Sequence, residues 1–196
     1  MIPESIKYFI ERFSKLPSLG PRLATRLAFY LASADKNDLD ALEKAVGNLK
    51  KINRCGQCFF LSDGKDLCGI CSNPKRDKSV IAIVEKETDL MSLEQTGNFK
   101  GHYLVLGELT ERGSLEVAQK LRLQTLKDKI KNSGKAKEII VALSPSTFGD
   151  FVGGLIKQEF KDLSEKITRL GRGIPTGGEI EFADEETLSQ ALERRN

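Results

Sequence analysis

Residues 55–71 read CGQCFFLSDGKDLCGIC and contain all four cysteines of this 196-residue chain. Cys55 and Cys58 form one C-x2-C pair, and Cys68 and Cys71 form a second pair after a nine-residue spacer. Each pair places two thiolates on one side of a tight turn, and two pairs complete a tetrahedral sulfur shell that suits Zn²⁺. Because cysteine fills all four positions, no position is left for water. We therefore predict one structural zinc ion per chain and no catalytic metal there.

Two other uses of the cysteines are disulfides in a secreted protein and a redox-active dithiol. Residues 1–13 carry four charged side chains and form no hydrophobic signal segment. The chain has no run of about 18 apolar residues, so we expect no membrane span and a cytoplasmic location. A reducing cytoplasm favours metal-bound thiolates over disulfides, and dithiol exchange does not require two pairs at this spacing.

Charge is distributed unevenly along the chain. The formal net charge is only +3, but residues 1–78 alone carry +5. A basic surplus in the front third points to a polyanionic partner there, and a solvated surface of mixed charge accounts for it equally well.

The front of the chain predicts two helices joined by a corner. Apolar residues recur at helical spacing over 2–13, and the stretch Leu16-Pro-Ser-Leu-Gly-Pro21 then interrupts the pattern. A second helix is expected over 21–32, with Leu23 and Tyr30 among its inward-facing residues. Gly20 can take a positive φ in the corner.

This corner is a candidate binding site for the DNA backbone. A tight turn before a helix exposes backbone N–H groups, which attract anions. Arg22 and Arg26 lie one turn apart on the second helix and would add contacts to neighbouring phosphates. Such contacts hold DNA without reading its sequence. A plain antiparallel helix pair with a Pro/Gly corner is the alternative.

After a third helix over 36–54, the cysteine stretch and Lys78, the sequence alternates between strand and helix patterns. Such alternation predicts a mostly parallel sheet with helices on its faces. Strands are expected at 79–84, 101–106, 138–143 and 166–170, and helices at 88–95, 115–131, 148–160 and 184–192. Thr88 is the expected N-cap of the first of these helices. The lone His102 is expected to be structural.

Three carboxylates follow strands of this predicted sheet. Glu85 ends the first strand, Asp89 follows shortly after, and Asp150 follows the third strand. Ligands gather at the carboxyl ends of parallel strands, so these residues are candidates for a weak Mg²⁺ site or a partner-binding surface. The alternative is that Glu85 and Asp89 are ordinary loop carboxylates that cap the next helix.

Residues 16–31, LPSLGPRLATRLAFYL, resemble the helix-hairpin-helix motif LPGxGxKxAxRLAxxL of the RecR family of bacterial recombination mediators. Arg22 and Arg26 stand at the basic positions of that motif, Gly20 is retained, and Ser18 replaces its first glycine. The four cysteines follow in the family's order. Val84-Glu85 and the stretch 101–107 resemble the family's Toprim domain, and 168–188 resembles its ending.

The resemblance implies an α/β multidomain chain with four parts. These are a helix-hairpin-helix DNA-binding region (1–53), a four-cysteine zinc finger (54–76), a Toprim-type parallel α/β sheet (77–170), and a C-terminal Gly-rich loop and helix (171–196). Catalytic Toprim domains carry an Asp-x-Asp pair. This chain has Phe148-Gly149-Asp150 there and lacks one carboxylate. Leu104 and the loop 108–115 also depart from the family pattern.

The function that the resemblance implies is non-catalytic. The chain would bind single- and double-stranded DNA and, with RecO or RecF, help to load the recombinase RecA in DNA repair. It would form a homo-oligomer, either a dimer or a ring tetramer. A Mg²⁺-dependent Toprim nuclease or primase-like enzyme is one alternative, and a zinc-ribbon adaptor that binds only protein is another.

Overall fold

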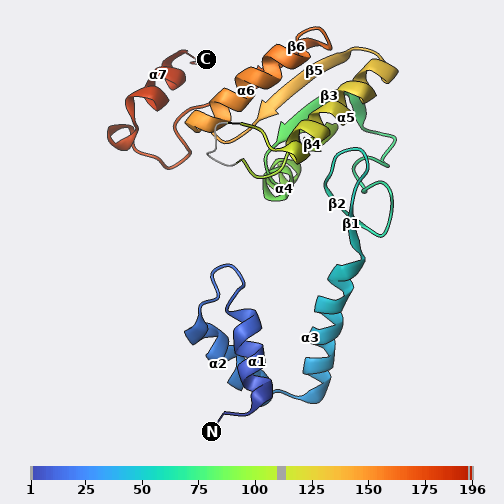
Figure 1. Ribbon diagram of the computed structural model, residues 1–196. Helices are drawn as coiled ribbons and strands as arrows, with labels where there is room; N and C mark the ends of the chain where they lie inside the picture. The colour runs from blue at the N-terminus through green and yellow to red at the C-terminus, as the bar shows by residue number, and fades with distance from the viewer. Residues whose placement is uncertain (1, 110–113, 194, 196) are drawn as a thin grey trace. The chain divides into compact units, whose positions relative to one another are not determined.

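The computed structural model describes residues 2–109, 114–193 and 195. The chain divides into two compact units, residues 1–52 and residues 53–196. Figure 1 labels their elements, and each unit is considered by itself.

The first unit is helical. α1 (Glu4–Phe13) and α2 (Pro21–Ala32) pack together, and α3 (Lys36–Asn48) follows. Ala24 and Ala28, one turn apart, are the buried residues of α2. Small side chains allow close approach of two helices, which explains why the inner face of α2 runs through these alanines. Leu23 and Tyr30, which we expected to face inward, are 49% and 71% exposed.

The third helix is shorter than the sequence pattern predicted. It ends at Asn48, and a single 3-10 turn, η1 (Leu49–Lys51), leads into β1 (Ile52–Arg54). β1 pairs with β2 (Leu61–Asp63) in a two-stranded sheet. The extended backbone here brings the Cys55 N–H to the Phe60 carbonyl at 2.8 Å. The start of the cysteine stretch therefore requires a strand where helical periodicity alone favoured a helix.

The second unit is built on a four-stranded parallel sheet. Its strands are β3 (Asp77–Val84), β4 (Gly101–Val105), β5 (Ala136–Ala142) and β6 (Ser164–Arg169), in the order β4-β3-β5-β6. The end of β3, one of the two inner strands, is buried, as expected for a strand covered on both faces.

Helices cover both faces of this sheet. α5 (Val117–Ser133) and α6 (Thr147–Phe160) supply Leu126 and Ile156 to a core that includes Ile83. α4 (Glu87–Gln95) supplies Leu90 to a second core with Val84 and Tyr103. The α/β multidomain fold predicted from the sequence is confirmed.

The cysteine stretch packs against the edge strand β4. The Val105 N–H donates to the Cys58 carbonyl at 2.8 Å. Phe59 packs against the core under α5 and α6, whereas Phe60 and Ile70 pack against the core under α4. The cysteine stretch therefore closes one edge of the sheet and joins both cores.

The tail of the chain is more exposed. It consists of a 3-10 turn, η2 (Ile180–Phe182), and α7 (Glu185–Glu193). No described residue after Arg169 is buried. Across the described ranges, none of the helices has the length and apolar character needed to cross a membrane.

Candidate nucleic-acid interface and metal centre

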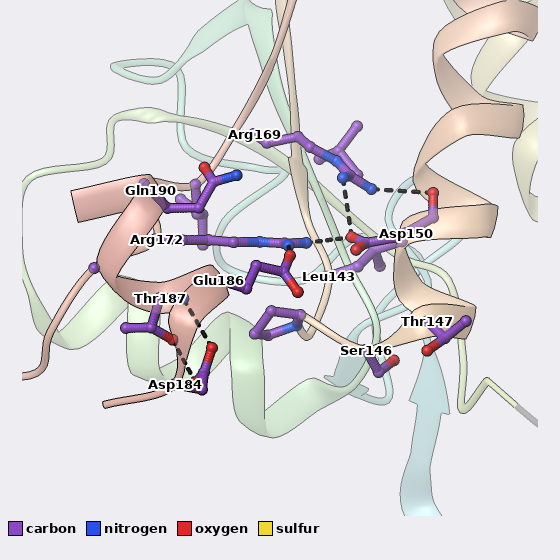
Figure 2. Close-up of a pocket in the computed structure, with 15 residues that line it drawn as sticks. Leu143, Ser146, Thr147, Asp150, Arg169, Arg172, Asp184, Glu186, Thr187 and Gln190 are labelled. Atoms are coloured by element: carbon purple, nitrogen blue, oxygen red, sulfur yellow. Dashed lines mark hydrogen bonds and ion pairs between the residues drawn. The ribbon is translucent and has the colours of Figure 1, made fainter. Parts of the chain in front are cut away.

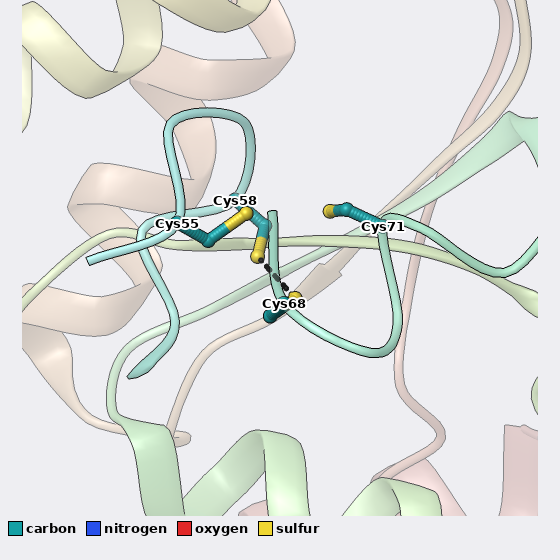
Figure 3. A group of neighbouring side chains, drawn as sticks. All are labelled: Cys55, Cys58, Cys68 and Cys71. Carbon is teal, nitrogen blue, oxygen red and sulfur yellow. Dashed lines mark hydrogen bonds between the residues drawn. The ribbon is translucent and has the colours of Figure 1, made fainter. Parts of the chain in front are cut away.

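The four cysteine side chains converge as their spacing predicted. All are buried, all are free thiols, and their Sγ atoms lie within 4.8 Å of one another (Figure 3). Zn–S bonds of about 2.3 Å in a tetrahedron place sulfur atoms about 3.8 Å apart. The Sγ atoms of Cys58 and Cys68 are 3.5 Å apart, far beyond the length of a disulfide bond. The donor set and its size thus fit one tetrahedral metal ion.

Backbone geometry holds the thiols in place. The Gly56 N–H donates to the Asp66 carbonyl at 2.9 Å and ties the two halves of the stretch together. Phe59 takes a φ of 62°, a left-handed conformation that turns the chain after Cys58. Because Phe59 also packs into the core, the turn that shapes the metal centre is anchored to the sheet.

Crowding makes the thiols unequal. Burial raises the pKa of the Cys55 thiol, but backbone N–H groups of Cys68, Cys58 and Gln57 outweigh burial and lower this pKa to about 7. The pKa of Cys58 is raised, first by its hydrogen bond with the Cys71 thiol and then by burial. A bound cation would remove this inequality between the thiols, because it would stabilise all four as thiolates.

The helical corner differs in detail from the sequence prediction. Gly20 is the N-cap of α2 with an ordinary φ of −69°. The positive φ belongs instead to Ser18, at 61°, within a turn closed by the Leu19 N–H and the Leu16 carbonyl at 3.2 Å. Gly20 can take a positive φ, but this corner does not use that freedom. The left-handed residue is the serine that replaces the first glycine of the hairpin motif.

The start of α2 presents anion-binding groups. No side chain caps this end of α2, and Pro21 occupies its first turn. The backbone N–H groups of Arg22 and Leu23 therefore have no intrahelical acceptor. Arg22 and Arg26 are exposed, and among the hydrogen bonds and ion pairs of the described residues neither side chain takes part in one. Two uncompensated positive charges thus stand beside free N–H donors.

The three candidate carboxylates are not gathered into one site. Glu85, which is buried, accepts the Leu109 N–H at 3.2 Å. Asp89 accepts the Lys86 N–H at 2.9 Å and closes the N-terminus of α4. The N-cap is Lys86, so the expectation that Thr88 fills this position was wrong. Within the described ranges, the cysteine quartet is the sole group of three or more His, Cys, Asp or Glu whose ligand atoms converge.

Asp150 lies beside a cavity of about 880 Å³ at the ends of β5 and β6 (Figure 2). Its Oδ1 is 2.9 Å from Nη1 of Arg169 and also pairs with Arg172, which in turn lies 3.1 Å from Glu186 of α7. Arg172, first by hydrogen bonding and then by charge, holds the pKa of Asp150 below its usual range. Arg169 and Arg172 lie 19 and 22 residues after Asp150 in the chain, and no sequence pattern paired either of them with it.

His102 is fully buried in β4, and neither ring nitrogen has a hydrogen-bond partner. Burial, followed by the charges of Lys129, Lys78 and Arg76, lowers its pKa to about 4. The imidazole is therefore neutral at physiological pH.

Comparison with known proteins finds matches along most of the chain. The model of "RecR, helix-hairpin-helix" matches residues 6–49, a "Toprim domain" model matches 79–171, and "RecR, C-terminal" matches 173–196. The Recombination protein RecR of Rubrobacter xylanophilus is 38% identical over 97% of this chain and 96% of its own length. The chain belongs to the RecR family.

Other RecR proteins agree to the same degree. That of Clostridium perfringens is 39% identical over 98% of this chain and 96% of its own length, and that of Gloeobacter violaceus is 37% identical over 100% and 98%. Leu104, one departure from the RecR pattern, is fully buried in the core under α5 and α6. Within the other departure, the loop 108–115, residues 110–113 lie outside the described residues.

Proposed function

We propose that this RecR-family protein is a non-catalytic, DNA-binding mediator of recombination and DNA repair. Its relatives carry the name Recombination protein RecR. The observation that carries the proposal is the start of α2, where Arg22 and Arg26 stand uncompensated beside free backbone N–H groups. Both kinds of group suit phosphate oxygens, and neither reads a base.

The binding mode follows from the strength of such contacts. Phosphate contacts by exposed arginines are individually weak and are screened by salt. Several hairpins acting together in a homo-oligomer, a dimer or a ring tetramer, would raise affinity through effective concentration. We therefore propose an oligomer that holds single- and double-stranded DNA without sequence preference.

The remaining parts have supporting roles in this proposal. One Zn²⁺ per chain binds Cys55, Cys58, Cys68 and Cys71, and because four thiolates leave no open position, the ion stabilises the fold and does no chemistry. The α/β domain would bind partner proteins of the RecO or RecF type, at the edge that carries Glu85, Asp89 and Asp150. Together these proteins would help to load RecA onto single-stranded DNA in the cytoplasm.

The DNA-binding role is tested by Arg22→Ala with Arg26→Ala. If each arginine meets one phosphate, affinity falls and the slope of log affinity against log salt concentration decreases in magnitude by about 1.4 on single strands, or about 1.8 on duplex DNA. The matched control is Lys7→Ala with Lys15→Ala, which removes the same charge from α1 and from the turn that follows it, where both lysines are already ion-paired with glutamates. Fluorescence anisotropy with labelled single strands at several salt concentrations measures both quantities. An unchanged slope in the arginine variant removes the hairpin from the DNA site.

The non-catalytic assignment has its own test. Wild-type protein incubated with Mg²⁺ and labelled DNA should leave the DNA intact, and Glu85→Gln should bind DNA with wild-type affinity. Metal-dependent cleavage that Glu85→Gln abolishes would instead support a Toprim nuclease.

A further inference from the structure

The surroundings of Asp150 differ from those of a metal ligand. Asp150 lies in the first turn of α6, after β5, at the edge where parallel α/β sheets bind ligands. Its carboxylate faces two guanidinium groups (Figure 2). Arg169, the last residue of β6, donates to Oδ1 at 2.9 Å, and Arg172 of the tail pairs with the same oxygen.

Both arginines are held by further contacts. Arg169 Nη2 donates to the Asp150 carbonyl at 3.2 Å, so its guanidinium lies along the first turn of α6. Arg172 is additionally fixed by Glu186, 3.1 Å away. The two cations are therefore positioned by elements on both sides of the carboxylate.

α6 is shaped to accept Arg169. Gly153 is buried in the middle of this helix, and a Cβ there would overlap the Arg169 guanidinium. Glycine inside a helix costs about 0.5–1 kcal/mol relative to alanine. A neighbouring glycine, Gly154, has open space around its Cβ position. The space for Arg169 thus depends on a particular glycine of α6.

The other carboxylates of this edge do not complete an oxygen shell around Asp150. Glu85 is engaged by the Leu109 N–H and lies 3.7 Å from Lys86 Nζ, and Asp89 is used as a helix cap. Mg²⁺ demands near-octahedral oxygen coordination and gives up its water reluctantly. The residues present do not fit such an ion.

We propose that Arg169 and Arg172 are the resident counter-cations of Asp150, and that they keep divalent cations away from this edge of the sheet. The guanidinium groups neutralise the charge of the Asp150 carboxylate. They also occupy the position that a metal ion would need beside it. Through Arg172, the same contact attaches the C-terminal tail to the α/β domain. The inference does not rest on the proposed DNA-binding role.

The test uses Mn²⁺ as a paramagnetic probe of the isotope-labelled, zinc-loaded full chain. In the wild type, millimolar Mn²⁺ should not selectively broaden the amide signals of Gly149, Asp150 and Phe151. Arg169→Gln with Arg172→Gln should bind Mn²⁺ there at a concentration at least about tenfold lower than the wild type needs, because removing nearby positive charge strengthens cation binding. Adding Asp150→Asn should abolish the effect.

The matched control is Lys161→Gln with Lys166→Gln, which removes two charges from the end of α6 and from β6 without touching Asp150. It should behave as the wild type does. Selective broadening at Asp150 in the wild type overturns the proposal, and so does a folded, zinc-loaded arginine variant that binds no more Mn²⁺ than the control. If the arginine variant does not fold, the wild type still decides: Mg²⁺ should leave the Asp150 carboxyl ¹³C signal unchanged, and a saturable shift overturns the proposal.

Discussion

Ser18 carries the most unusual backbone conformation of the helical corner. Its φ of 61° lies in the left-handed region, which costs a residue with a Cβ about 1 kcal/mol or more. Short polar side chains tolerate this region better than branched apolar ones. The corner of the hairpin is thus retained although the first glycine of the family motif is absent.

We expect Ser18→Val to lower the free energy of unfolding by about 1–3 kcal/mol, because a β-branched residue is poorly tolerated at positive φ. Ser18→Gly should change it by no more than about 0.5 kcal/mol, because relief of strain offsets the larger chain entropy of glycine. Ser14→Val is the control, since Ser14 has an ordinary φ of −65°. Chemical denaturation measures all three, and equal losses at Ser14 and Ser18 would show that the left-handed conformation is not the cause.

His102 makes stability depend on pH. Its pKa is about 4 in the fold and about 6.5 in an unfolded chain. Between these values the unfolded chain binds a proton that the folded chain does not. Stability should therefore fall as the pH drops from about 6.5 to 4, by up to about 3 kcal/mol. His102→Leu should remove that part of the slope in denaturation curves recorded across this range. The chain has a single histidine, so an unchanged slope in the variant would refute the assignment.

At the scale of elements, α6 carries the carboxylate of Asp150 in its first turn. At Gly153, the same helix leaves space for the guanidinium group of Arg169. Its two adjacent glycines have different surroundings: Gly153 is buried against Arg169, whereas Gly154 is exposed and open. Of these two adjacent glycines, Gly153 is the one that packing requires.

Gly154→Ala should stabilise the protein by about 0.5–1 kcal/mol, as expected for a helix interior. Gly153→Ala should gain less or lose stability, because its methyl group displaces the Arg169 guanidinium from Asp150. Thermal unfolding of the two variants provides the comparison. Equal gains in stability would mean that the Arg169 guanidinium does not occupy the space beside Gly153.

At the scale of the whole molecule, the metal centre is part of the second unit and not an appendage. The cysteine stretch bonds to the edge strand through Cys58 and Val105 and contributes Phe59 and Phe60 to different cores. Loss of the metal should therefore increase the flexibility of the sheet as well as that of the cysteine stretch.

Cys58→Ala should release zinc and increase amide hydrogen exchange at Val105 and along β4, with little change in α1 and α2, which belong to the other compact unit. Ser72→Ala is the control, because Ser72 is exposed and its side chain is not a metal ligand in this arrangement. A variant that lost zinc and kept wild-type exchange at Val105 would contradict the coupling.

The sequence by itself determined the features that depend on local spacing. The C-x2-C pairs predicted a four-thiol cluster, and the alternation of strands and helices predicted a parallel sheet, because each pattern is set by residues that are near neighbours in the chain. Local pattern was less reliable where a neighbouring element overrides it. The helix expected over 36–54 ends at Asn48 because Arg54 belongs to a strand that pairs with β2, and the left-handed residue is Ser18 instead of Gly20.

Only the tertiary structure decided what the carboxylates do. Asp150 meets arginines 19 and 22 residues further along the chain, and Glu85 meets the backbone N–H of Leu109, 24 residues away. These partners are brought together by the order of strands in the sheet and by the path of the tail. The spacing of these residues in the sequence does not predict such contacts, because they form only when separate elements pack together.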